Sequence, residues 1–225
     1  MIDSLKNLQR RLGYQFQEPA LLERALTHRS AAGQSYERLE FLGDAVLGMV
    51  IAEALFEQGP ELGEGDLTRL RASLVKRETL AELARDLALD GEIRLGGGSL
   101  KAGDHRRDSI LSDVMEAIIG AVCVDGGRDA AAQCIRSIYR HRLANLPDPE
   151  TLKDPKTRLQ QLLQARQLPL PSYEIVESSG PDHKRSFVVE CKVPSLERSF
   201  RAEGSNRRAA EQAAAAQALE EIKHG

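Results

Sequence analysis

The sequence predicts a multidomain protein in which an all-α domain is followed by a smaller α+β domain with the element order α-β-β-β-α. Three observations predict this arrangement. Apolar residues recur at three- and four-residue spacing through about the first two thirds of the 225 residues, which is typical of helices. Three prolines then interrupt the chain between residues 147 and 155. After them the apolar residues alternate, which is typical of strands.

The first domain is expected to be helical throughout, because no segment before the prolines alternates like a convincing strand. Glycine-rich joints separate several of the expected helices, as at 96–98 and 126–127. The expected helices cover residues 21–26, 37–57, 67–75, 78–87, 110–124 and 130–143.

The proline-rich segment cannot continue a helix, because proline lacks a backbone N–H and restricts the residue before it. We therefore expect two domains, residues 1–146 and 153–225, joined by a linker at 147–152. In the second domain, helices are expected at 156–164 and 209–222, and strands at 173–177, 187–193 and 199–202. Ser205 or Asn206 is a suitable N-cap for the last, alanine-rich helix.

Composition predicts a cytoplasmic protein with no membrane partner. The chain does not start with a basic segment and an apolar run, and no apolar run approaches the roughly 20 residues that cross a bilayer. The three cysteines lack the spacing of zinc ligands and are expected to be reduced thiols. The net charge of −3 argues at first against a nucleic-acid partner, but acidic residues exceed basic ones only before residue 153. Metal ions could offset those carboxylates.

Three carboxylates are expected to share one stripe of the helix at 37–57. At 100° per residue, Glu37 and Asp44 lie within about 20° of each other, and Glu40 lies about 60° to one side. Like charges at this spacing repel, and few basic residues compensate them. The pattern alone is also compatible with a solvated acidic face.

A second pair of carboxylates, Asp113 and Glu116, lies three residues apart in an apolar helix. They are the only charges between Asp108 and Asp125, so no basic residue of that helix can offset them. Two such groups are costly to bury unless something positive meets them, although they can also lie on an exposed edge. Together with the first stripe, they predict a site for a hard cation between two facing helices.

Carboxylate oxygens without nearby histidine or cysteine suit Mg²⁺, with Mn²⁺ as a substitute. The five histidines do not supply the Glu-x-x-His pattern of a di-iron bundle, and no organic cofactor is expected. Magnesium held by few protein ligands usually acts on phosphates, where metal ions activate a water and stabilise the leaving oxygen.

Three segments carry a family resemblance. Glu37-Arg-Leu-Glu-Phe-Leu-Gly-Asp44 resembles the signature motif of the ribonuclease III family, and the segment 108–120 resembles its second acidic motif. The intervening segment 64–72 is also similar to the family pattern. The three occur in the family's order and cover most of residues 1–146, which implies an all-α ribonuclease III endonuclease domain.

The resemblance implies roles for six acids. The metal-binding cluster would be Glu40, Asp44, Asp113 and Glu116, and the residues with catalytic roles would be Asp44, Glu116, Glu37 and Glu64. Glu116 would be a central metal ligand, whereas Glu37 and Glu64 would line the cleft, contact RNA and set the cleavage geometry.

The resemblance also implies a homodimer, because two catalytic domains of this family pair through the signature helix. Phe41 would then lie at the dimer interface. A phenylalanine at this spacing is equally compatible with the core of its own domain.

The second domain carries features suited to A-form RNA, whose minor groove exposes 2′-hydroxyls and whose narrow major groove leaves its phosphates reachable. These are polar side chains on its first helix, a turn at 180–184, and two arginines at the start of its last helix, where the helix dipole adds to the attraction for phosphate. Taken singly, such residues are usually ordinary surface groups. The candidate RNA contacts are Gln160, Gln164, His183, Lys184, Arg207 and Arg208.

In their order along the chain, the segments 154–160, 180–183 and 204–214 resemble the double-stranded RNA-binding domain, across residues 153–222. Glu211 differs from the strongest binders of that class, many of which carry a lysine there. We therefore expect moderate affinity from this domain alone.

Together the two resemblances imply an endoribonuclease that hydrolyses double-stranded RNA to 5′-phosphate and 3′-hydroxyl ends with short 3′ overhangs. Ribosomal RNA precursors and structured messenger RNA would be its substrates. The main alternative is a non-cleaving double-stranded RNA-binding protein, which predicts loss of a metal ligand, and none is lost. An enzyme for small phosphates would have no use for the second domain.

Overall fold

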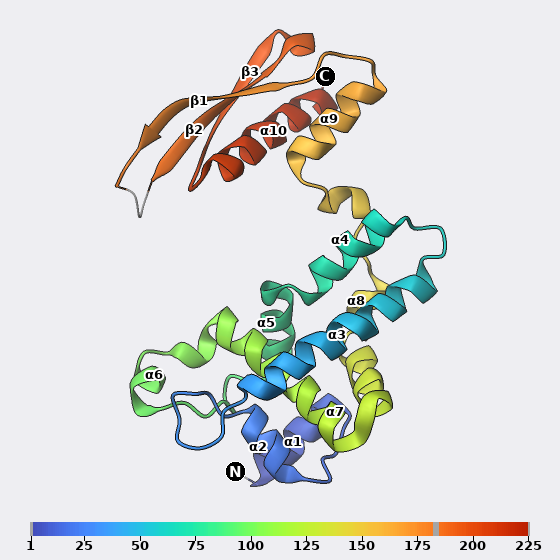
Figure 1. Cartoon of the computed structure of the whole chain (residues 1–225), viewed down its shortest axis with the longest axis vertical. Helices are drawn as coiled ribbons and strands as arrows, with labels where there is room; N and C mark the ends of the chain where they lie inside the picture. The colour runs from blue at the N-terminus through green and yellow to red at the C-terminus, as the bar shows by residue number, and fades with distance from the viewer. Residues whose placement is uncertain (1, 182–184, 225) are drawn as a thin grey trace. The chain divides into compact units, whose positions relative to one another are not determined.

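The computed structural model describes residues 2–181 and 185–224. The chain divides into two compact units, Met1–Pro149 and Glu150–Gly225. Figure 1 shows that the first unit is built of helices and that the second combines a sheet with two helices. Among the described residues, no helix has both the length and the apolar character needed to cross a membrane.

The first unit is helical, which confirms the all-α prediction. Within its described residues, 2–149, sheet-like pairing is limited to one isolated bridge between Thr27 and Arg94. Its α-helices are α1 (Ile2–Leu12), α2 (Pro19–Ala25), α3 (Glu37–Gln58), α4 (Glu64–Val75), α5 (Arg77–Asp86), α6 (Gly97–Lys101), α7 (Asp108–Ile138) and α8 (Arg140–Ala144), with a 3-10 turn, η1, at Asp104–Arg106.

Two helices lie outside the predicted ones. Helix α1 buries Leu8 and Leu12 completely, so its apolar residues do follow helical spacing, which the sequence prediction missed. Helix α6 begins at Gly97, inside a segment predicted as a joint. The other glycine joint is a kink within α7, where Gly127 has φ 82°, a conformation that glycine adopts readily.

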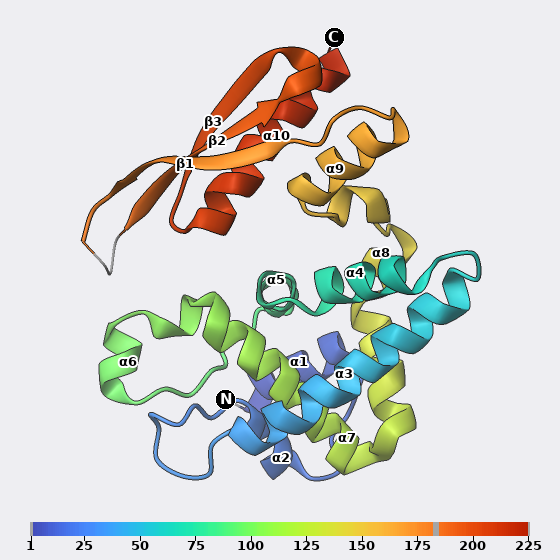
Figure 2. The same ribbon diagram turned by 45° about the horizontal axis from the view of Figure 1, so that its top comes forward.

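Helices α3 and α7 cross at the centre of the first unit, and two glycines let their backbones meet (Figures 1 and 2). A Cβ on Gly43 would lie 1.8 Å from the backbone oxygen of Glu116, and a Cβ on Gly120 would lie 2.0 Å from that of Leu39. Any larger residue would therefore force the helices apart. The buried apolar residues around the crossing are Leu39, Val46, Leu47, Val50, Ile51, Leu111, Val114, Met115, Ile118 and Ile119.

In the second unit, α9 (Pro155–Ala165) and α10 (Arg207–His224) pack on one face of an antiparallel sheet, which confirms the predicted α+β order (Figure 2). The strands are β1 (Ser172–Ser179), β2 (Ser186–Val193) and β3 (Arg198–Gly204), and they adjoin in chain order. Short 3-10 turns lie at Pro149–Leu152 (η2) and Pro194–Leu196 (η4). The core shared by helices and sheet consists of Leu159, Leu163, Cys191, Val193, Ala214, Ala215, Ala218 and Leu219.

Both helices of the second unit begin with a side-chain cap. Asp154 accepts a hydrogen bond from the backbone N–H of Thr157 at 2.9 Å, ahead of Pro155 in the first turn of α9. Asn206 accepts one from the N–H of Ala209 at 2.9 Å, so Asn206 rather than Ser205 caps α10. The caps fix where α10, with its two arginines, begins.

Gly120→Ala should destabilise the first unit, because the new methyl group meets the backbone of α3. We expect a loss of about 1–3 kcal/mol in the free energy of unfolding, the usual cost of overpacking a core, measured by urea denaturation. Gly91→Ala is the matched control, since Gly91 is exposed and its Cβ would meet nothing within 4 Å. Equal stability of the two variants would mean that the helices do not meet at Gly120.

Candidate metal centre and RNA-binding surface

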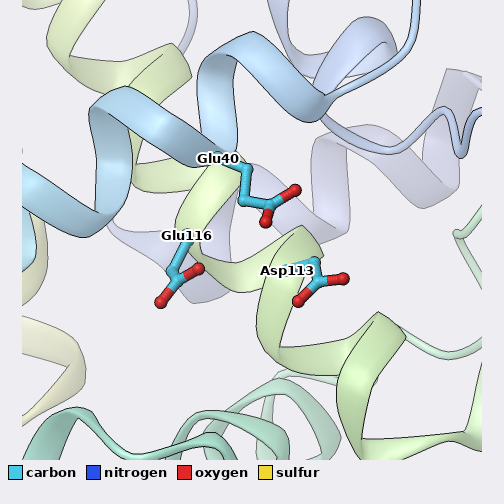
Figure 3. Close-up of side chains that lie close together, drawn as sticks. All are labelled: Glu40, Asp113 and Glu116. Atoms are coloured by element: carbon cyan, nitrogen blue, oxygen red, sulfur yellow. The ribbon is translucent and has the colours of Figure 1, made fainter.

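Three carboxylates from the two crossing helices converge at one place. Glu40 comes from α3, and Asp113 and Glu116 come from α7 (Figure 3). One oxygen of each lies within 4.8 Å of the others, and all three side chains are partly buried. The convergence follows from the crossing, because Glu40 lies three residues before Gly43 and Glu116 lies four residues before Gly120.

The raised pKa of Glu116 shows that grouping these carboxylates is electrostatically unfavourable without a cation. Burial raises the pKa of Glu116 to about 8, and the negative charges of Asp44, Glu40 and Asp113 add to the effect. Burial also raises the pKa of Glu40, with contributions from Asp113 and Glu37. At neutral pH these carboxylates therefore interact favourably with positive charge.

Neighbouring polar and basic residues, most of them outside the two acidic motifs, offset part of this charge. Burial raises the pKa of Asp113, while a hydrogen bond from the Ser112 hydroxyl, at 3.3 Å, and the charge of Arg77 oppose the rise. The buried Tyr36 hydroxyl lies 3.5 Å from Asp113 Oδ2. Arg29 acts in the same way on Glu40. Tyr36, Arg29 and Arg77 were missed by sequence reasoning, because they reach the site from other elements of the fold.

The chemistry of the donor set fits a hard divalent cation. The group offers carboxylate oxygens alone, with no histidine nitrogen or cysteine sulfur among its members. Such ligands suit Mg²⁺, Mn²⁺ or Ca²⁺ rather than zinc or copper. A cation there would relieve the mutual repulsion that raises the pKa of Glu116.

The other predicted acids lie outside this compact group. Asp44 is exposed, but its charge acts on both Glu40 and Glu116. Glu37 is also exposed, and it accepts a hydrogen bond from the Ser35 hydroxyl at 2.8 Å. Glu64 begins α4, is exposed, and accepts a hydrogen bond from the Thr68 hydroxyl at 3.0 Å. The structure thus brings together three of the four predicted metal ligands.

Phe41 is not part of the core of its own unit. Its side chain is 81% exposed, and Phe56, also on α3, is 74% exposed. Phe41 lines a surface groove of about 550 Å³ with Leu21, Leu42 and Val124. The core alternative for Phe41 is therefore wrong, and an apolar surface on α3 remains.

The second unit presents four of the predicted RNA contacts at its surface. Gln160 and Gln164 are exposed on α9, one turn apart. Arg207 and Arg208 are exposed in the first turn of α10. The other two candidates, His183 and Lys184, lie outside the described residues.

Fold and site together define a class of protein: an enzyme with a carboxylate centre between two helices, joined to an α-β-β-β-α domain of the RNA-binding kind. Comparison with known families agrees. The family model described as "Ribonuclease-III-like" matches residues 18–143, and the model described as "Double-stranded RNA binding motif" matches residues 155–222.

Relatives are similar over nearly the whole chain. A "Ribonuclease 3" of Pasteurella multocida is 50% identical over 220 residues, which are 98% of this chain and 98% of the relative. A "Ribonuclease 3" of Nitrosococcus oceani is 52% identical over 221 residues, 97% and 95% of the two chains. A solved structure of the ribonuclease III nuclease domain from Campylobacter jejuni superposes with a TM-score of 0.58 at 40% identity, covering 60% of this chain and 96% of that one.

The chain therefore belongs to the ribonuclease III family. It is an endoribonuclease of double-stranded RNA with a helical nuclease domain and a double-stranded RNA-binding domain, as the sequence motifs implied.

Thermal stability of the metal-free protein should fall as the pH rises. The pKa of Glu116 is raised from 4.5 to about 8 in the folded state, so between these values the folded protein holds a proton that the unfolded chain releases. Stability from this group is complete below the lower value and lost as pH passes the upper one. Melting measured in chelator between about pH 5 and pH 8.5 should show the decline.

In the same titration, Glu116→Gln should show a clearly smaller decline, because the titrating carboxyl group is gone. Glu61→Gln, a change at an exposed glutamate, should keep the wild-type profile. Identical profiles for all three proteins would mean that Glu116 is not held protonated in the fold.

Proposed function

We propose that the chain cuts both strands of an RNA duplex by hydrolysing phosphodiesters at the centre formed by Glu40, Asp113 and Glu116, with Mg²⁺ as the cofactor and Mn²⁺ as a substitute. The observation that carries this proposal is the convergence of the three carboxylates, with the pKa of Glu116 raised to about 8. A cluster with that electrostatic character favours a cation over a proton when the cation is available.

Each acid has a role in the proposal. Glu40, Asp44, Asp113 and Glu116 hold the cation, with Asp44 completing the set from the exposed side. Bound there, a divalent ion would activate a water and stabilise the charge on the leaving oxygen. Glu37 and Glu64 line the cleft, where their exposed carboxylates contact the RNA and set which bond is cut.

The reaction balances as a simple hydrolysis. The water oxygen forms a bond to phosphorus and loses a proton, and the bond between phosphorus and the 3′-oxygen breaks. The 3′-oxygen takes up a proton, which leaves a 5′-phosphate and a 3′-hydroxyl. Paired active sites on opposite strands would give short 3′ overhangs. Precursors of ribosomal RNA and structured messenger RNA in the cytoplasm are the proposed substrates.

RNA is held by the second domain in this proposal. Gln160 and Gln164 on α9 face the minor groove, and Arg207 and Arg208 at the start of α10 meet phosphates. His183 and Lys184, which follow β1 in the sequence, are proposed to complete the contact. The proposed domain limits are residues 1–146 for catalysis and 153–225 for RNA binding, with a linker at 147–152.

We further propose that the enzyme is a homodimer paired through α3. Support comes from the exposed apolar side chains along that helix, Phe41, Met49 and Phe56, which a monomer would leave in water. The groove beside Phe41 offers a complementary surface, as a two-fold interface requires. The nuclease domain of the Campylobacter jejuni enzyme has structural flexibility in a region involved in dimer formation.

Cleavage of long duplex RNA should require Mg²⁺ and Glu116. Glu116→Ala should lower the cleavage rate by more than about 100-fold, since losing an outer-sphere partner of a metal already costs 10- to 100-fold. Duplex binding, followed by gel shift in chelator, should stay near wild type. Glu61→Ala, an exposed change on the same domain, is the control and should cleave normally.

The same assay separates the alternatives. Binding without cleavage in Mg²⁺ would identify a non-cleaving RNA-binding protein. Near-normal cleavage by Glu116→Ala would show that the carboxylate cluster is not the metal centre. Cleavage in chelator would remove the cofactor from the proposal altogether.

Phe41→Glu should weaken the dimer, because a charge would have to be buried at its interface. We expect the dissociation constant to rise by about 30-fold or more, the effect of losing a strong interface residue, measured by sedimentation over a dilution series. Leu170→Glu, a similar change at an exposed leucine of the second domain, should leave assembly unchanged. A monomeric wild-type protein, or a dimer indifferent to Phe41→Glu, would contradict pairing through α3.

A further inference from the structure

Glu211 is a buried carboxylate in the second domain, although its sequence position suggested only a missing lysine. Its side chain is 10% exposed, in the second turn of α10. Lys156 Nζ donates a hydrogen bond to Glu211 Oε2 at 2.5 Å, and Arg207 Nε donates one to Oε1 at 2.8 Å. Each carboxylate oxygen therefore has its own cationic partner, and the three groups are called the Glu211 clasp.

The clasp joins separate parts of the domain. Lys156 lies in the first turn of α9, and its Nζ also lies 4.4 Å from the centre of the Tyr173 ring in β1. Burial acts to raise the pKa of Glu211, but the hydrogen bonds from Lys156 and Arg207 outweigh it and hold the pKa below its ordinary value. The carboxylate is thus charged at neutral pH, and the start of α10 is tied to the start of α9.

The clasp leaves Arg207 oriented but accessible. Its Nε is bonded to Glu211, while its side chain as a whole is 63% exposed. A guanidinium held through Nε still carries four N–H groups on its two terminal nitrogens, which can donate to a phosphate. An arginine already fixed in this way loses less conformational freedom when it binds than a freely rotating one does.

The backbone beneath the clasp is also fixed. A Cβ on Gly204, at the end of β3, would lie 2.4 Å from the backbone nitrogen of Ala210, so the strand end presses directly against the first turn of α10. Asn206 caps that same turn. Glu211 therefore holds Arg207 in a fixed orientation relative to the end of β3 and the first turn of α10.

We propose that Glu211 is a positioning residue for duplex RNA, which holds Arg207 in the orientation that meets a backbone phosphate and ties it through Lys156 to the helix that carries Gln160 and Gln164. The inference rests on the proposed RNA-binding role of Arg207. It reverses the expectation that a glutamate at this position weakens binding.

Glu211→Gln tests the proposal, because the two explanations predict opposite changes in the affinity for duplex RNA. The substitution removes one negative charge, so simple electrostatic attraction to RNA would become stronger. Loss of positioning should instead weaken duplex binding by about three- to ten-fold, the range expected for one hydrogen-bonded contact. The slope of log affinity against log salt should become shallower by about 0.7–0.9, the value for one phosphate contact.

Three further variants complete the experiment, with the full chain and duplex RNA in chelator. Glu221→Gln removes the same charge from the same helix, at an exposed residue paired with Arg198, and should bind as wild type or slightly more tightly. Arg207→Lys keeps the charge but lacks Nε, so it should match Glu211→Gln in affinity and slope. The double variant Glu211→Gln/Arg207→Lys should lose nothing beyond either single one.

The outcomes are distinct. Tighter or unchanged binding by Glu211→Gln, normal binding by Arg207→Lys, or additive losses in the double variant would overturn the positioning role and leave the proposed function intact. If Glu211→Gln lowers the melting temperature of the domain, Arg207→Lys decides, because that exposed change does not disturb the core. A wild-type chain that binds no duplex at any salt concentration would overturn both the positioning role and the proposed function.

Discussion

The contact between α3 and α7 at Gly43 and Gly120 is the constraint on which the candidate active site depends. Two helices usually keep their axes 8–10 Å apart because side chains separate them. Here each glycine faces a backbone carbonyl of the other helix, so nothing separates the backbones at the crossing. Glu40 and Glu116 lie about one turn before those glycines and are brought together as a result. The carboxylates repel one another, so it is the packing of α3 against α7 that holds them close together.

That repulsion links stability to ligand binding. The pKa of Glu116, raised to about 8 by burial and by its neighbours, means that the fold holds a group in a state that water would not favour. Arg29, Arg77 and the Tyr36 hydroxyl reduce the imbalance without removing it. A ligand that binds only the folded protein adds its binding free energy to stability. The electrostatic energy that weakens the metal-free domain is therefore the same energy that a divalent cation would recover.

Much of this could be predicted from the sequence, because the decisive signals were local. Helical spacing in the first domain and alternating apolar residues in the second distinguished an all-α domain from an α+β domain. Asp113 and Glu116 stood out because they are the only charges in an apolar helical segment. What could not be predicted depended on contacts between distant segments. Helical geometry placed Glu37, Glu40 and Asp44 on one stripe, and the fold brings only Glu40 of these three into the compact group with Asp113 and Glu116. The hydrogen bond from Tyr36 and the charge of Arg77 reach Asp113 only after folding. Helix α6 starts at Gly97, in a glycine run whose local pattern predicts a joint rather than a helix.

Charge counting fails in both domains for one reason: a formal charge does not describe the field outside the protein until its partners are known. Glu211 counts as repulsive to RNA, yet its charge is already matched by Lys156 and Arg207, so little of it acts beyond the clasp. The acidic centre of the first domain also counts as repulsive, but a divalent cation there would offset two of its negative charges and present its own positive charge to a phosphate. A net charge of −3 is therefore no obstacle to binding a polyanion. The obstacle would be carboxylates that are exposed, unmatched and close to the RNA backbone.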